Sequence, residues 1–394
     1  MDFMKAIRVM TGDIIKYHAD ILCKDELILS CNISCAKDII VEDIIQHKKT
    51  FINSINITHI LNKRCSIINR YGLLDCLKEL GLSSKLDLLR ITHGVSLTDC
   101  LWVKFRGEDL RWKNVCPYGQ KHSFDINWFL DKSNPYLKNV LPNYSTDGQF
   151  AKCWMSDAFG NYLVKTGTSG AYNAGLEPLS ETLFTQIASS IGYVNYVKYE
   201  PYFIDYTGTG YQYKQTGILQ KVIGPCSKRL ATKCDAFTDE DASLVTAAEL
   251  GLSSYEDCIE FAKELVPNSF ELEYMLLCDC IGFNTDRHMG NIGFVYYPNN
   301  MHIYEVAPMY DNNLSLLCYW DERDDIYEYA KTRKAHDGSE FVELAGKLLS
   351  KNNHLFEILK TIDIQLSSNM IVDDRLDILN KVIKDNIKSI LKGE

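Results

Sequence analysis

The chain has 394 residues, of which 46% are hydrophobic and 24% charged, as in ordinary soluble globular proteins. This length allows two or three lobes with sizeable cores. The formal net charge of −10 argues against a dedicated binder of naked nucleic acid, because such binders neutralise phosphates with lysine and arginine.

Cysteine usage and the lack of export signals place the protein in a reducing environment. The sequence has 14 cysteines but no C-x-x-C pair and no second pair at zinc-site spacing. The N-terminus lacks a signal-peptide core, and no run of about 18 apolar residues predicts a membrane span. We therefore expect free thiols and a cytoplasmic protein.

Residues 1–125 are predicted to form an N-terminal α/β domain of unknown role. Short apolar runs separated by turn residues indicate strands over residues 5–34. Apolar residues at helical spacing then predict helices over 38–62 and 70–90. A helix pair beside a hairpin also allows a DNA-reading module, although such pairs are more often packing units.

Residues 126–238 have the pattern of the small lobe of a kinase. A polar loop containing Ser145, Thr146, Asp147 and Gly148 precedes a strand, a turn over 156–161 and a second strand over 162–165. Small and hydroxyl residues beside a glycine allow backbone N–H groups to approach phosphates, although an ordinary polar turn has the same pattern.

A lysine and a glutamate in this lobe have the order of a kinase ion pair. Lys165 ends the apolar strand, where kinases carry the lysine that reaches the nucleotide phosphates. The helix that follows starts at Pro178 and carries Glu181 in its second turn, with Glu177 one turn earlier. We predict a Lys165–Glu181 pair, with Glu177 as the alternative.

Further strands over 193–204, 211–223 and 229–237 predict an antiparallel sheet, with a turn over 206–210. The polar connector that follows is the expected hinge, and we predict that backbone groups at Ala236 and Phe237 bind adenine there. Residues 239–394 are predicted to form a helical large lobe.

The most informative stretch is F-N-T-D-R-H-M-G-N-I-G-F over residues 283–294. It places Asp286 five residues before Asn291, in a polar loop between an apolar helix and a strand. D-x-x-x-x-N is the spacing of kinase catalytic loops, in which the aspartate accepts or orients the proton of the acceptor hydroxyl and the asparagine holds magnesium.

A predicted hairpin follows, with strands over 292–297 and 301–306 around Pro298, Asn299 and Asn300. Because a hairpin turns the chain back, it places Asp311 near Asn291. Two oxygen ligands are compatible with Mg²⁺, which takes few protein ligands together with phosphate oxygens and water.

Together these motifs resemble the HipA-like kinases over roughly residues 140–345. The T-D-R-H-M-G-N motif and the P-M-Y-D-N-N-L-S motif at 308–315 carry the resemblance. It implies an α+β, two-lobed protein-kinase-like fold, with a small antiparallel β lobe, a helical large lobe and an N-terminal α/β extension. It also implies ATP- and Mg²⁺-dependent phosphorylation of Ser/Thr in a protein substrate.

In that resemblance Asp286 corresponds to the catalytic aspartate, Asn291 and Asp311 to the magnesium ligands, and Lys165 to the nucleotide lysine. Residues 145–148 correspond to the phosphate loop, and Ser145 to the serine that some members autophosphorylate. A small DNA-binding antitoxin partner is a further expectation. Two alternatives stay open: a phosphoinositide or small-molecule kinase, since D-R-H also occurs in phosphoinositide kinases, and a catalytically silent nucleotide-binding regulator.

Overall fold

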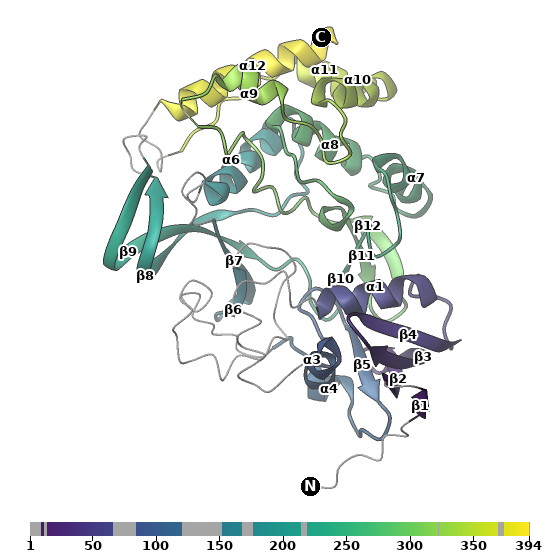
Figure 1. Ribbon diagram of the computed structural model, residues 1–394. Coiled ribbons are helices and arrows are strands. Elements are labelled where there is room, and N and C mark those ends of the chain that lie inside the picture. Colours follow the sequence, from purple (N-terminus) through teal and green to yellow (C-terminus); the bar gives the residue numbers. More distant parts are fainter. Residues whose placement is uncertain are drawn as a thin grey trace. The chain divides into compact units, whose positions relative to one another are not determined.

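The computed structural model describes most of the chain, and its helices and strands are drawn in Figure 1. The described residues are 9–11, 14–65, 84–119, 152–167, 176–213, 219–321, 323–368 and 374–393. They divide into two compact units. The first unit comprises Met1–Tyr162, Ala236–Gly251 and Phe294–Tyr304, and the second comprises Leu163–Asp235, Leu252–Gly293 and Glu305–Glu394.

The first unit is built on a five-stranded antiparallel sheet with two helices beside it. Its strands and helices are β1 (Val9–Thr11), β2 (Ile14–Cys23), β3 (Glu26–Cys35), β4 (Ile39–Gln46), α1 (Ser54–Arg64), α3 (Lys85–Thr92) and β5 (Leu101–Phe105). The sheet order is β1-β2-β3-β4, and β5 pairs with β2 beyond the part that pairs with β1. Trp102 is buried in the core and donates from Nε1 to the Lys24 carbonyl at 2.6 Å.

Part of the helix expected over residues 38–62 is a strand. β4 pairs antiparallel with β3, and the helix starts only at Ser54. The reason is composition, because β4 contains four isoleucines and one valine in eight residues. Such β-branched side chains favour a strand. Of the helix expected over 70–90, the structure describes α3, which starts at Lys85.

The first unit also contains four short strands and one helical turn: α4 (Trp112–Val115), β6 (Lys152–Ser156), β10 (Ser243–Thr246) and most of β11 (Gly293–Tyr297) and β12 (His302–Val306). The order β10-β11-β12 includes the hairpin that the sequence predicts over residues 292–306. The strand expected before the 156–161 turn is present as β6.

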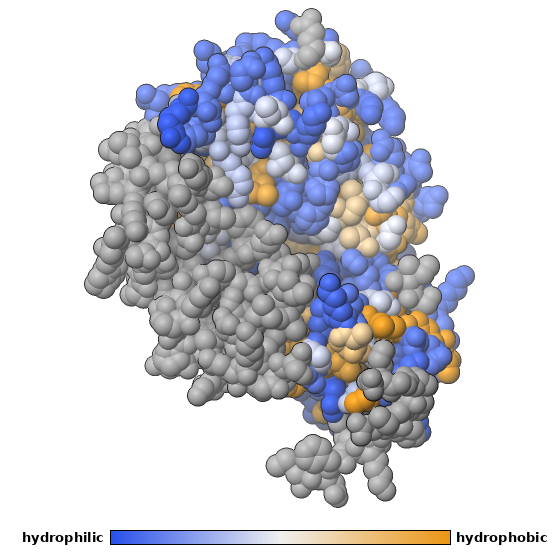
Figure 2. Space-filling model, in the orientation of Figure 1, coloured by the Kyte–Doolittle hydropathy of each residue, from blue (hydrophilic) through white to orange (hydrophobic). Residues whose placement is uncertain are grey.

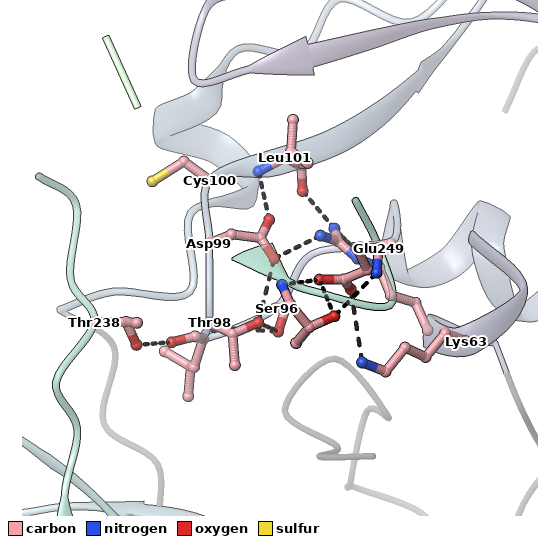
Figure 3. A network of polar contacts seen from close by, with 12 residues as sticks. Lys63, Ser96, Thr98, Asp99, Cys100, Leu101, Thr238 and Glu249 are labelled. Atoms are coloured by element: carbon pink, nitrogen blue, oxygen red, sulfur yellow. Dashed lines mark hydrogen bonds and ion pairs between the residues drawn. The ribbon is translucent and has the colours of Figure 1, made fainter. Parts of the chain in front are cut away.

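A network of polar contacts joins α1, residues 96–101 and the segment Ala236–Gly251 within this unit (Figure 3). The buried Asp99 carboxylate accepts from the Arg64 guanidinium at 2.5 Å and from the Leu101 N–H at 2.8 Å. Thr238 donates to the Leu97 carbonyl at 2.7 Å. Residues that follow the expected hinge are therefore fixed to the N-terminal part of the chain.

The second unit combines an antiparallel sheet with helices. The part of the sheet in this unit has the order β7-β9-β8, formed by β7 (Asn161–Thr166), β8 (Glu200–Tyr213) and β9 (Leu219–Asp235). The turn expected over 206–210 is wrong, because β8 continues through it with a shift in register between Tyr206 and Gly208. A β-bulge keeps the pairing there. The strand expected over 229–237 is the end of β9, and residues 193–199 precede β8.

Helix α8 is the centre of the helical part. The helices are α6 (Glu177–Ser190), α7 (Tyr255–Leu265), α8 (Glu271–Gly282), α9 (Ile326–Lys331), α10 (Phe341–Lys351), α11 (Asn353–Thr361) and α12 (Arg375–Lys392). α8 is buried along most of its length and packs against α6, α7, α10 and α12 (Figure 1). A helix that is apolar on all sides belongs inside a core. The C-terminal helices carry mainly hydrophilic residues on their visible outer faces (Figure 2).

Two findings bear on the expectations from composition. The described cysteines whose burial is known are free thiols, and all but Cys35 are buried. Across the described ranges, the structure has no helix that combines the length and apolar character needed to cross a bilayer.

Candidate active site

Lys165 and Glu181 form an ion pair inside the second unit. Lys165 lies near the end of β7 and Glu181 in the second turn of α6, which begins with Pro178 in its first turn. The Lys165 Nζ atom is 3.2 Å from Glu181 Oε1, and both residues are almost fully buried. Thr232 of β9 donates to the other oxygen of Glu181 at 2.9 Å. The pair thus joins β7, α6 and β9.

Glu177, the alternative partner from the sequence, has a different contact. Its carboxylate accepts a hydrogen bond from the Tyr319 hydroxyl at 3.0 Å. Of the two glutamates, the structure therefore places Glu181 against Lys165.

Asp311 contacts the same lysine from another part of the chain. Lys165 Nζ donates to Asp311 Oδ1 and forms an ion pair with it. The hairpin of β11 and β12 precedes Asp311. At its base the Ala307 N–H donates to the Gly293 carbonyl at 2.9 Å, so the two ends of the hairpin are held together. One ammonium group is therefore shared by carboxylates from α6 and from the 308–315 segment.

The loop that carries Asp286 and Asn291 begins where α8 ends. Gly282 is the last residue of α8, and Phe283 follows it in the left-handed conformation, with φ of 54°. The Asn291 side chain donates from Nδ2 to the Asp286 carbonyl at 2.8 Å. The asparagine therefore closes the loop on the residue that precedes it by five positions.

The buried Arg287 links this loop to the 308–315 segment. Its guanidinium pairs with Asp279 of α8, with Nε 2.8 Å from Oδ2. The same group donates to the Asn291 carbonyl at 3.0 Å and the Tyr310 carbonyl at 2.7 Å, and also contacts Asn312 Oδ1. The backbones that carry Asn291 and Asp311 are thereby held by one side chain.

The pair of Arg287 with Asp279 was not predicted from the sequence, although both residues lie in stretches on which the predicted site depends. Asp279 is a buried carboxylate in the apolar part of α8, and a buried charge requires a partner. Arg287 belongs to the T-D-R-H motif itself. The carboxylate within an apolar stretch was the signal from which this ion pair could have been predicted.

Further contacts hold the 308–315 segment in place. The Thr285 N–H donates to the Leu314 carbonyl at 3.3 Å, and the Leu316 N–H donates to the Gly282 carbonyl at 2.7 Å. The Ser180 hydroxyl on α6 donates to the Ser315 carbonyl at 2.6 Å. The segment is thus bonded both to α6 and to the loop after α8.

The charges of the cluster do not balance. Burial raises the pKa of Asp286, and the nearby Asp311 raises it further, while His288 and Lys165 oppose this shift. Burial likewise raises the pKa of Glu181, against the effect of Lys165. Although burial opposes it, Asp311 and Glu181 raise the pKa of Lys165, which stays protonated. Three carboxylates therefore interact with one lysine.

This donor set fits a hard cation bound with phosphate. Asp311 would offer carboxylate oxygens and Asn291 an amide oxygen, and the excess of carboxylates would favour a divalent ion. Among the residues that the structure describes, three or more His, Cys, Asp or Glu side chains do not gather as metal ligands. A site for Mg²⁺ here would therefore use few protein ligands, as Mg²⁺ commonly does beside a nucleotide.

Two groups of residues expected to bind the nucleotide are not among the described residues of the second unit. Ser145, Thr146, Asp147 and Gly148 are outside the described residues. Ala236 and Phe237 begin the Ala236–Gly251 part of the first unit, and the Ala236 N–H donates to the Asn161 carbonyl at 2.9 Å. The Ala236 N–H is thus already used within the first unit. The expected roles of these residues stay predictions.

Comparison with solved structures identifies the class of fold. HipA of the Shewanella oneidensis MR-1 toxin–antitoxin system, solved with HipB and its operator DNA, is similar over 95% of this chain and 96% of its own, at 12% identity and a TM-score of 0.50. The fold is therefore α+β and protein-kinase-like, with small antiparallel sheets and a helical part.

Two other kinases align over less of the chain. The Helicobacter pylori proinflammatory kinase CtkA matches 61% of this chain and 90% of its own, at 14% identity and a TM-score of 0.40. The Golgi casein kinase matches 63% and 71%, at 9% identity and a TM-score of 0.35. Neither a scan against models of protein families nor a search of curated proteins returns a match.

Proposed function

We propose that this chain is an ATP- and Mg²⁺-dependent kinase that transfers the γ-phosphoryl group to Ser or Thr of a protein. The observation that carries the proposal is the double pairing of Lys165 with Glu181 and Asp311. A lysine–glutamate pair beside an aspartate from a later loop is the arrangement that kinases require for nucleotide and metal.

Each residue then has a defined task. Lys165 contacts the nucleotide phosphates and is held by Glu181. Asp286 orients the acceptor hydroxyl and accepts its proton, while Asn291 and Asp311 hold Mg²⁺. The ion supplies charge neutralisation at the transferring phosphate when it is bound. Positioning and electrostatic stabilisation provide most of the rate enhancement in this chemistry.

Arg287 supports these tasks without touching the reacting atoms. It binds the carbonyls of Asn291 and Tyr310, so it fixes the two backbones that present the magnesium ligands. Its pair with Asp279 leaves its own charge compensated. We therefore assign Arg287 a positioning role.

The resemblance of the motifs around Asp286 and Asp311 to the HipA-like kinases favours a protein as the acceptor over a phosphoinositide or a small molecule. The excess of carboxylates over lysine favours an active kinase over a silent nucleotide binder, because it provides for a divalent ion. HipA was solved with HipB and operator DNA. By analogy, we propose a small DNA-binding protein as a partner of this chain.

The test is phosphoryl transfer from γ-labelled ATP. Purified protein is incubated with labelled ATP and Mg²⁺, alone, with a cell protein extract and with phosphoinositide vesicles. We expect label in protein, as phosphoserine or phosphothreonine, and none in lipid. The Asp286→Asn variant removes the proton acceptor and should transfer no label, whereas Asp377→Asn, at an exposed position of α12, should match wild type.

Label in lipid alone would overturn the choice of acceptor. Equal labelling by wild type and Asp286→Asn would overturn the assignment of the site. ATP binding without transfer to protein or lipid would support the silent binder.

A further inference from the structure

The segment before β8 lies along the backbone that leads to Asp311. The Val197 N–H donates to the Met309 carbonyl at 2.9 Å, and the Met309 N–H donates to the Asn195 carbonyl at 2.8 Å. Tyr196 and Met309 form a parallel bridge. This pairing brings Tyr199, two residues beyond Val197, to the level of Asp311, two residues beyond Met309.

Tyr199 makes a direct hydrogen bond to the backbone of Asp311. The Asp311 N–H donates to the Tyr199 hydroxyl oxygen at 3.0 Å. Tyr199 is 7% exposed, so its ring is fixed by packing. Burial, and to a smaller extent the charge of Glu181, raises the pKa of this phenol well above its usual value, so the group is a neutral hydroxyl.

Asp311 needs such a contact because of its backbone conformation. Its φ is 56°, in the left-handed region that residues other than glycine rarely adopt. Aspartate tolerates this region better than most residues, but a strained backbone persists only where its surroundings enforce it. The Tyr199 hydroxyl holds the backbone, and Lys165 holds the carboxylate.

We propose that Tyr199 is a positioning residue for the metal site, acting through its hydroxyl on the backbone of Asp311. The inference rests on the proposed function, because it concerns how tightly the site binds Mg²⁺ together with a nucleotide. Removing the hydroxyl frees the Asp311 N–H and lets the backbone leave the left-handed region. The carboxylate then takes up several orientations, and Mg²⁺ binds less tightly with the nucleotide.

The test measures nucleotide affinity with and without the metal, independently of catalysis. Binding of ADP is followed by calorimetry in EDTA and in saturating MgCl₂ for wild type and Tyr199→Phe. We expect Mg²⁺ to tighten ADP binding to wild type, and this gain to fall about three- to tenfold in the variant, as the loss of one hydrogen bond implies. The affinity for ADP in EDTA should differ by less than about twofold between wild type and Tyr199→Phe, because the proposed role of Tyr199 acts through Asp311 alone.

Tyr193→Phe is the matched control. Tyr193 is also a buried tyrosine of the second unit, but its hydroxyl has no hydrogen-bond partner among the described residues. Its ring stacks on Tyr274 at 5.9 Å, and phenylalanine preserves that packing. This variant should keep the full gain from Mg²⁺.

The outcomes separate this inference from the proposed function. If wild type binds no ADP under either condition, the proposed function fails. If Mg²⁺ tightens ADP binding equally in wild type and Tyr199→Phe, only the role of Tyr199 fails.

A second measurement needs no variant. Amide hydrogen exchange of wild type without nucleotide should show slow exchange at Asp311, because its N–H is bonded to Tyr199. Exchange at Asp311 as fast as in an unprotected loop would overturn the inference, even if Tyr199→Phe did not fold.

Discussion

The two units each contain a cluster of buried and half-buried charges, and the two clusters differ in the balance of positive and negative groups. In the first unit Arg64 faces Asp99 and Lys63 faces Glu249, so two cations meet two carboxylates (Figure 3). In the second unit the single Lys165 interacts with Glu181, Asp311 and Asp286. A balanced cluster is complete as structure, whereas we propose that the excess of carboxylates around Lys165, of which Asp286 and Asp311 are half-buried, receives a cation from outside.

The carboxylates of the two clusters also differ in their hydrogen-bond and ion-pair partners. Asp99 accepts from the Leu101 N–H and from Arg64, and Glu249 accepts from the Thr246 N–H at 2.8 Å and from the Thr246 hydroxyl. Each of these carboxylates therefore combines hydrogen bonds from a neighbour in the sequence with an ion pair to a residue of α1. In the second unit, Lys165 contacts Glu181, 16 residues away, and Asp311, 146 residues away. The first cluster joins α1, residues 96–101 and the segment Ala236–Gly251 as structure, whereas we propose that the second assembles groups for chemistry.

After Asp286→Asn, which should abolish transfer, the largest effect should come from Asp311→Asn. The substitution removes the carboxylate proposed to hold Mg²⁺ and should lower phosphoryl transfer on the order of a thousandfold, as for loss of a group that stabilises transition-state charge. Lys165 keeps Glu181 as its partner, so thermal unfolding should change little. The assay uses labelled ATP, with Asp377→Asn as control. Activity within tenfold of wild type would remove Asp311 from the site.

Arg287→Gln should affect stability most strongly. It leaves the buried Asp279 without its charged partner, and breaking such a pair costs about 3–5 kcal/mol. Chemical denaturation measures the loss in free energy of unfolding. The control is Arg323→Gln, which breaks an exposed pair with Asp321 and should cost less than about 1 kcal/mol. Equal effects of the two substitutions would contradict the assigned role of Arg287.

Gly282→Ala tests the packing beneath the loop that carries Asp286 and Asn291. A Cβ atom at Gly282 would lie 2.5 Å from the Phe184 ring of α6. Overpacking costs about 1–3 kcal/mol, against roughly 1 kcal/mol gained from helix propensity. We expect a net loss of about 1–2 kcal/mol in denaturation experiments. Gly346→Ala in α10 has nothing within 4 Å of the added Cβ and should instead stabilise. The same sign at both sites would refute the argument.

The smallest effect should come from Glu249→Gln in the balanced cluster. Burial opposes ionisation of Glu249, but Lys63, Thr246 and Arg64 together lower its pKa below the usual value. Its stabilisation is therefore present above the ordinary glutamate pKa and is lost as pH falls through the lowered value. We expect a deficit of about 1 kcal/mol at pH 7 that shrinks below about pH 4.5. A deficit that grows on acidification would contradict this sign.

The sequence was sufficient where the signal is local. Lys165 at a strand end and Glu181 in the second turn of the next helix follow from spacing, and the hairpin of β11 and β12 follows from its turn residues. The order of these elements led to the pairing of Lys165 with Glu181, and to Asp311 as a second acidic group near the site.

The features that could not be predicted from the sequence depend on contacts between residues far apart in the chain. Tyr199 reaches Asp311 across 112 residues, and no spacing rule connects the two. Neither does spacing reveal that Arg287 bonds to the Tyr310 carbonyl. The strand β4 was missed for a different reason, because its isoleucines fit helical spacing while their β-branched side chains favour a strand. Tertiary pairing with β3 decided the outcome.

The most direct test of the account compares the two clusters by activity. Phosphoryl transfer from labelled ATP with Mg²⁺ is measured for wild type, Asp286→Asn and Glu249→Gln, each corrected for the folded fraction. The account predicts that Asp286→Asn transfers no label while Glu249→Gln matches wild type. Label from Asp286→Asn at the wild-type level, or its loss in Glu249→Gln, would contradict the assignment of the catalytic centre to the second unit.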